Sequence, residues 1–160
     1  MFTGKRISPH EVAAYHDDVD IYWQACAWAD TTVSCDWVRK TLQKGVAASK
    51  DGHEEFVLLC DNLTGQTHED FKRAVREING IVYYGPPGAT NIWQPVDAAY
   101  GSTLKRLITQ EQDLWLDLDE NMDKWIGNKP LSASDRRILI TQWVGEAHKR
   151  LMSKDYDNFR

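Results

Sequence analysis

Apolar positions change their spacing several times along the chain, and each change predicts a different element. Val19–Trp28 is rich in aromatic and β-branched residues that roughly alternate with polar ones, which predicts a β-strand. Helical spacing follows. It predicts an amphipathic helix from about Thr32 to Ala48, with an apolar stripe of Val33, Trp37, Val38, Leu42 and Val46.

Two short, continuously apolar segments flank a helical pattern in the middle of the chain. Phe56–Cys60 and Ile81–Tyr84 are typical of strands that are covered on both faces. Between them, a capping-box-like pattern at Thr67 opens a helix that Gly80 is suited to end. Strand, helix and strand over this length predict a parallel pair joined by a right-handed crossover.

The remaining chain is predicted to be helical. One long helix should follow Asp97, with one side formed by Leu104, Leu107, Ile108, Trp115, Leu118, Met122 and Trp125. Residues 127–130, Gly-Asn-Lys-Pro, should end it. The segment Ser132–Asp135 should cap a last helix that carries Ile140, Trp143, Val144, Ala147 and Leu151.

Composition narrows the class of protein. A length of 160 residues with 42% hydrophobic residues and seven Trp indicates one packed globular domain. The net charge of −5 disfavours a stand-alone DNA-coating protein, but not a nuclease, because a metal site is itself acidic. Three cysteines without CxxC spacing indicate reduced thiols in an intracellular protein. We expect neither a membrane span nor a signal peptide, because no long apolar stretch is present.

Two acids are the strongest candidates for chemistry. Asp61 directly follows the apolar segment Phe56–Cys60, and Asp97 ends a Pro-rich loop before the predicted long helix. Ligands gather at the carboxyl ends of parallel strands, and a helix N-terminus favours a carboxylate. Two such carboxylates could share a pair of metal ions, with oxygen ligation that suits Mg²⁺ or Mn²⁺. Taken singly, however, Asp61 is also typical of a turn and Asp97 of a helix cap.

The motifs around these acids resemble a known family. Asp61-Asn62 lies at a strand end, and 35 residues separate Asp61 from Asp97. The loop before Asp97 contains Pro-Pro-x-x-Thr and Gln-Pro-Val-Asp, and Leu104-Lys105 follows a small-residue and aromatic turn. This pattern resembles the catalytic half of a DDE-superfamily transposase, closest to the mariner/pogo branch with its jerky and centromere protein B relatives. The similarity extends from about Gly4 to Ile108 and, more loosely, over the final helices.

The resemblance implies a fold and a site. The fold would be α/β, a partial ribonuclease-H-like mixed sheet flanked by helices, with residues 1–126 as the endonuclease-like domain and 127–160 as a C-terminal helical extension. Asp61 and Asp97 would be catalytic metal ligands for Mg²⁺ or Mn²⁺, and Asn62 a supporting group. Trp93 would stack on a base or anchor its loop, and Lys105 would contact phosphate or lie on a solvated helix face. The implied partner is DNA in the nucleus, with a homo-oligomer possible.

One departure from the family pattern shapes the expectation for this chain. The family's first catalytic acid lies on the first strand, and no acid upstream of Asp61 follows an apolar strand in that position. We therefore expect an N-terminally incomplete domain that is inactive alone and self-associates through an uncovered edge at Val19–Trp28. The alternative function is a domesticated, catalytically inactive module that binds nucleic acid or protein.

Overall fold

The computed structural model describes residues 1–3, 8–49, 54–86, 100–128 and 130–155. The chain forms two compact units, and the described residues of each have their own apolar core. The first unit contains Met1–Lys5 and Ile21–Ala98, and the second contains Arg6–Asp20 and Ala99–Arg160. The boundary expected at residue 126 falls within the second unit, between two of its helices.

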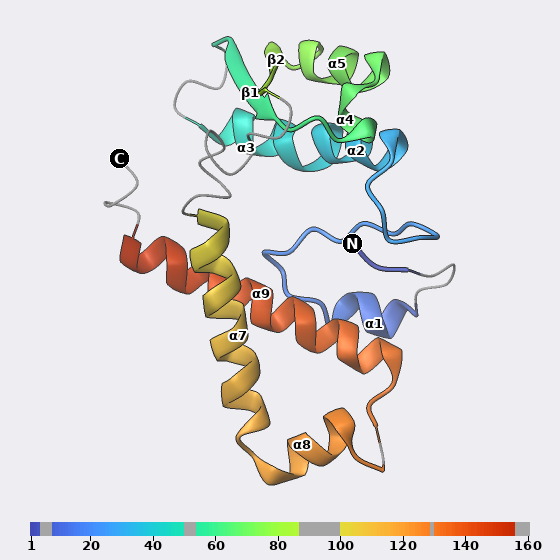
Figure 1. The fold of residues 1–160 in the computed structure, drawn as a ribbon, viewed down its shortest axis with the longest axis vertical. Helices are drawn as coiled ribbons and strands as arrows, with labels where there is room; N and C mark the ends of the chain where they lie inside the picture. The colour runs from blue at the N-terminus through green and yellow to red at the C-terminus, as the bar shows by residue number, and fades with distance from the viewer. Residues whose placement is uncertain (4–7, 50–53, 87–99, 129, 156–160) are drawn as a thin grey trace. The chain divides into compact units, whose positions relative to one another are not determined.

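The first unit contains a parallel pair of strands (Figure 1). Strand β1, Phe56–Cys60, pairs with β2, Gly80–Tyr84, in a register that runs from Phe56 opposite Gly80 to Cys60 opposite Tyr84. Helices α4, Thr64–Thr67, and α5, Glu69–Arg76, connect the two strands. The predicted parallel arrangement of adjacent strands is therefore confirmed, and the chain belongs to the α/β class.

The ends of α5 differ from the prediction. The N-cap is His68 rather than Thr67, because the His68 Nδ1 accepts the Asp70 backbone N–H at 3.2 Å. At the other end, Asn79 takes the left-handed conformation, with φ of 63°. Gly80 is the first residue of β2, and a Cβ there would lie 2.5–2.6 Å from Phe56 and Val75 side-chain atoms. Gly80 thus permits close packing of strand and helix instead of ending the helix.

The predicted helix from Thr32 to Ala48 is confirmed as three consecutive segments. They are α2, Thr31–Trp37, a π-helical turn η1, Val38–Leu42, and α3, Gln43–Ala48. Asp30 caps the start, since its carboxylate accepts the Val33 N–H at 2.9 Å. Together with α5 and one face of the sheet, these segments enclose a core of buried side chains made of Cys35, Val38, Cys60, Phe71, Ala74 and Val75.

The residues that the structure describes cover only one face of the strand pair, so the prediction of two covered faces was wrong. Phe56, Leu58, Val82 and Tyr84 pack against the core. The opposite face remains 47–60% exposed at its large apolar side chains, which are Val57, Leu59, Ile81 and Tyr83. A continuously apolar strand cannot by itself reveal how many layers cover it.

The segment Val19–Trp28 is not a strand, so the strand predicted there was wrong. Its only pairing among the described residues is one isolated parallel bridge between Trp23 and Phe2. The Gln24 side chain accepts the Cys26 N–H at 2.9 Å and donates to Asp30 at 2.6 Å, and Ala27 has φ of 51°. These local contacts close a turn where an extended backbone would otherwise continue.

The second unit is helical in its described part (Figure 1). It contains α1, Pro9–Ala13, α7, Gly101–Leu116, α8, Asp119–Ile126, and α9, Ala133–Asp155. The single long helix predicted after Asp97 is broken between α7 and α8. The buried Asn121 side chain donates to the Trp115 carbonyl at 2.9 Å, and Leu118 has an extended backbone. The Asn121 amide thus satisfies a carbonyl in the last turn of α7 that would otherwise have no helical partner.

Helix α9 begins with the predicted cap. The Ser132 hydroxyl accepts the Asp135 N–H at 3.1 Å and donates to its carboxylate at 2.7 Å, and the Ser132 N–H also donates to that carboxylate. Three tryptophans, Trp115, Trp125 and Trp143, join α7, α8 and α9 with ring centroids 5.3–6.1 Å apart. None of the described helices has a stretch long and apolar enough to cross a membrane.

Candidate active site

Asp61 lies at the carboxyl end of β1, where the sequence placed it. Its side chain is half-buried, and Oδ1 accepts the Leu63 backbone N–H at 3.1 Å. This bond forms an Asx turn that leads into α4, so the turn interpretation is confirmed. The turn also determines where the carboxylate lies, because it fixes the backbone at the point where a parallel strand meets its loop.

Asn62 joins the ends of the two strands. Its Nδ2 donates to the carbonyl of Gly85 at 3.1 Å, and the Gly85 N–H donates to the Cys60 carbonyl at 3.4 Å. Gly85 is buried and directly follows β2, so a side chain from one strand end satisfies a backbone acceptor at the other. These bonds fix the carboxyl-terminal edge of the strand pair, where Asp61 follows β1 and Gly85 follows β2.

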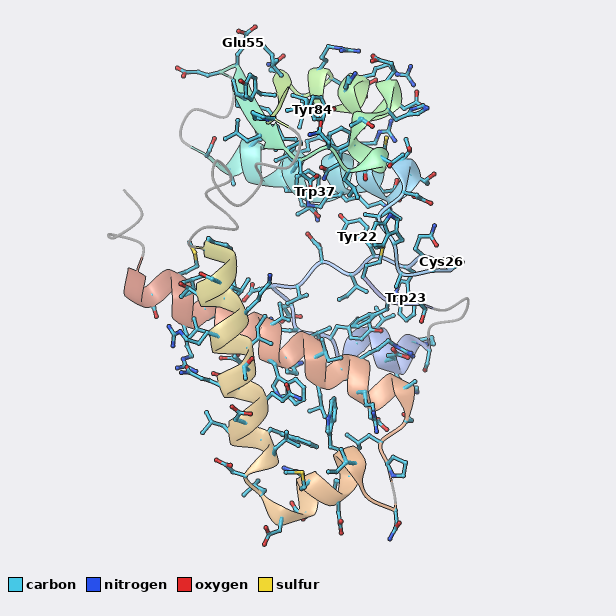
Figure 2. The ribbon with its side chains drawn as sticks, viewed as in Figure 1. Tyr22, Trp23, Cys26, Trp37, Glu55 and Tyr84 are labelled. Atoms are coloured by element: carbon cyan, nitrogen blue, oxygen red, sulfur yellow. The ribbon has the colours of Figure 1, made fainter. Side chains whose placement is uncertain are left out.

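The groups behind this edge are apolar and neutral. Burial, together with the negative charge of Asp61, raises the pKa of the Cys60 thiol to about 11, so Cys60 remains a thiol at neutral pH. Burial also raises the pKa of Tyr84, whose hydroxyl donates to the Gln66 carbonyl of α4. Figure 2 labels Tyr84 in the first unit, where it packs against the core. All three cysteines are free thiols, as predicted.

The remaining candidates are not brought to this edge by the described residues. Asp97 and Trp93 lie outside the described residues, so the predicted meeting of the Asp61 and Asp97 carboxylates stays a prediction. Lys105 is exposed on α7, in the second unit. Within the described ranges, no group of three or more His, Cys, Asp or Glu side chains is arranged to hold a metal ion.

The basic residues of α5 are paired with acids of the same helix. Lys72 lies 2.7 Å from Glu69, and Arg73 lies 2.5 Å from Asp70. Arg76 is 3.8 Å from Glu69. The acids of α5 therefore partly cancel the charge of its basic residues, on a face that is largely exposed to solvent.

Sequence reasoning identified Asp61 and Asn62 but missed the contacts of Gly85 and Tyr84. The sequence pattern placed Tyr84 only in its strand and gave Gly85 no role. The position of Gly85 immediately after the second strand could have indicated this contact. A buried carbonyl there no longer has a partner in the neighbouring strand and needs another hydrogen-bond donor.

The Asn62 amide provides a direct test of how this edge is held. We expect Asn62→Ala to lower the free energy of unfolding by about 1 kcal/mol, because the buried Gly85 carbonyl loses its side-chain donor. Urea unfolding monitored by tryptophan fluorescence gives the value, with exposed Asn128→Ala as the matched control. Equal stability of the Asn62→Ala and parent proteins would contradict the role given to this bond.

Residues 2–154 match the family described as DDE superfamily endonuclease. The chain belongs to this family. The match includes the described residues of both units, from the bridge at Phe2 to nearly the end of α9, so the two units belong to one family domain. No curated protein and no solved structure matches the chain.

Proposed function

We propose that this chain provides the DNA-cleaving domain of a transposase-derived endonuclease of the mariner/pogo type. The observation that carries the proposal is Asp61 at the carboxyl end of a parallel strand, held by a turn and joined through Asn62 to the end of β2. The chain leaves this edge after Gly85, and Asp97 comes later in the same Pro-rich segment of the sequence. Family membership supports an endonuclease, and the strand edge supports Asp61 as one of its carboxylates.

The donor types fit a hard divalent cation. Asp61 and Asp97 offer carboxylate oxygens, and oxygen ligation of this kind suits Mg²⁺ or Mn²⁺. These two acids would hold the metal, which supplies charge stabilisation and activates the attacking hydroxyl or water in phosphodiester cleavage. Asn62 keeps the strand ends together beside Asp61, while Trp93 and Lys105 would contact the bases and phosphates of DNA.

The broader assignment follows from the same family. The strand pair and its helices would be part of a ribonuclease-H-like sheet, with residues 1–126 as its endonuclease portion and 127–160 as the helical extension. The protein would act on DNA in the nucleus, where a homo-oligomer would bring together two DNA ends. The Val57, Leu59, Ile81 and Tyr83 face would contribute to self-association of the isolated chain, since it is apolar and exposed.

Metal binding tests the roles of the two acids. We expect Asp61→Asn and Asp97→Asn each to weaken Mn²⁺ binding by about a hundredfold. Each variant loses a charged metal ligand, and losing a ligand weakens binding at least as much as losing a residue that only supports a ligand. Electron paramagnetic resonance titration of free Mn²⁺ measures the change. Asp113→Asn, an exposed acid on α7, is the control and should bind like the parent.

Nicking of supercoiled plasmid by the protein separates the two candidate functions. An active nuclease should require Mg²⁺ or Mn²⁺ and lose nicking in both Asp→Asn variants. If Asp61→Asn binds Mn²⁺ as tightly as the parent, Asp61 is only a turn residue. If the protein binds DNA but does not nick it with any metal, the domesticated binding module is the correct function.

A further inference from the structure

Helix α8 presents an apolar stripe outward in the second unit. Leu118, Met122 and Ile126 recur at intervals of four residues and are 57%, 42% and 73% exposed. Met122 and Ile126 share one face of α8, and Leu118 is the N-cap residue directly before the helix. Large apolar side chains that are scattered singly over a surface need no explanation, but a group of three on one short helix and its cap does.

The inner face of the same helix is firmly attached. Asn121 is buried and donates to the Trp115 carbonyl, and Trp125 packs between Trp115 and Trp143. Arg136 donates to the Trp125 carbonyl at 2.6 Å and lies over its ring. Because α8 is held from inside, its outer face is already in place for a partner, which lowers the entropic cost of binding.

The charge around the stripe is strongly one-sided. Residues 111–126 contain six acidic residues and one Lys, a net charge of −5, which equals the net charge of the whole chain. The other residues balance, with 18 acidic and 18 basic side chains. Asp119 and Asp123 lie on the exposed face of α8, and they form no ion pair with any residue that the structure describes.

We propose that the outer face of α8 is a docking site for a basic amphipathic helix of another protein. Such a helix would place apolar side chains on Leu118, Met122 and Ile126, with Lys or Arg beside Asp119 and Asp123. A second copy paired through the same face would bring these acids against each other, and the rest of the chain offers no net positive charge. DNA is disfavoured because its phosphates carry the same sign of charge as this face.

Methionine methyl NMR locates the contact directly, because the chain has three Met residues. Met1, Met122 and Met152 are 44%, 42% and 41% exposed, so the other two are matched internal controls. The probe is a synthetic Leu/Lys peptide of about 18 residues, long enough to form a helix on contact. We expect the Met122 methyl signal to shift on titration, whereas the Met1 and Met152 signals stay in place.

Two double variants separate the apolar and the charged contributions. Fluorescence anisotropy with the labelled peptide should show about tenfold weaker binding for Met122→Gln/Ile126→Gln and about tenfold for Asp119→Lys/Asp123→Lys. Their controls are Val57→Gln/Ile81→Gln, an exposed aliphatic pair in the first unit, and Glu54→Lys/Glu77→Lys, which changes net charge equally. Both controls should bind the peptide as the parent does.

Several outcomes would overturn the proposal. Equally tight binding of a scrambled peptide with the same charge would show that the binding is only general electrostatic attraction between peptide and protein. An equal loss of binding in the charge control would show the same. A shift of all three methyl signals would place the peptide elsewhere. If sedimentation velocity shows that Met122→Gln/Ile126→Gln abolishes self-association instead of peptide binding, the face joins copies of this chain.

Discussion

Gly145→Ala should lower the free energy of unfolding by about 3 kcal/mol, the upper end of the range for forcing a methyl group into a packed site. A Cβ at Gly145 of α9 would overlap ring atoms of His16. That ring is buried and well bonded: its Nδ1 accepts the Asp18 N–H at 3.1 Å, and its Nε2 lies 3.2 Å from a Glu146 oxygen. Moving the ring would break both contacts, of which the one to Glu146 links His16 to α9.

The same substitution elsewhere gives the control. A Cβ at Gly45 of α3 would have no atom within 4 Å, so Gly45→Ala should stabilise the protein by about 0.7 kcal/mol through helix propensity. Urea unfolding of both variants should thus give changes of opposite sign. His16→Ala should recover part of the loss in Gly145→Ala, and an unchanged loss in that double variant would show that the ring is not the obstacle.

Arg137→Met should be the second strongly destabilising change, at about 3 kcal/mol near neutral pH, because it leaves a buried carboxylate without its partner. Arg137 donates to both oxygens of Glu11, at 2.6 and 3.0 Å, and the Tyr15 hydroxyl donates to the same carboxylate at 2.6 Å. Glu11 is buried, and these bonds, with Arg137 first, lower its pKa from 4.5 to about 2.

The sign of the pH dependence follows from this lowered pKa. The contribution of Glu11 to stability is fully present above its unfolded pKa of 4.5 and is lost as the pH falls towards about 2. The difference between the parent and Arg137→Met should therefore be largest at pH 7 and shrink as the pH falls below the unfolded value. Urea unfolding at about pH 7 and pH 3 tests this, with exposed Glu120→Gln as control. A difference that is equal at both values would contradict the ion-pair explanation.

Local sequence patterns were sufficient for much of the fold. The apolar segments at Phe56–Cys60 and Ile81–Tyr84 predicted the parallel pair, and helical spacing predicted the segment from Thr32 to Ala48. The Ser132 cap and the Asp61 turn were also predictable, since each depends on side chains within three residues of the backbone groups that they bind. The position of Asp61 at a strand end was therefore available from sequence.

Other features depended on polar side-chain contacts that reach six residues along the chain, farther than a turn or a helix cap. The turn that replaced the strand at Val19–Trp28 needs Gln24 to reach Asp30, and the break before α8 needs a buried Asn121 to reach Trp115. Periodicity does not register such polar contacts, because it records which positions are apolar and not which backbone groups a side chain can satisfy.

The sequence by itself determined the parallel strand pair, most of the helical segments, the strand-end acid and the family motifs. Only the tertiary structure decided that the described residues leave one face of the strand pair open, that Glu11 binds Arg137 across 126 residues, and that His16 fills the space above Gly145. The physical reason is the range of the interactions. Turns, caps and helical stripes are set by neighbours in the chain, whereas burial and ion pairing depend on which distant surfaces meet.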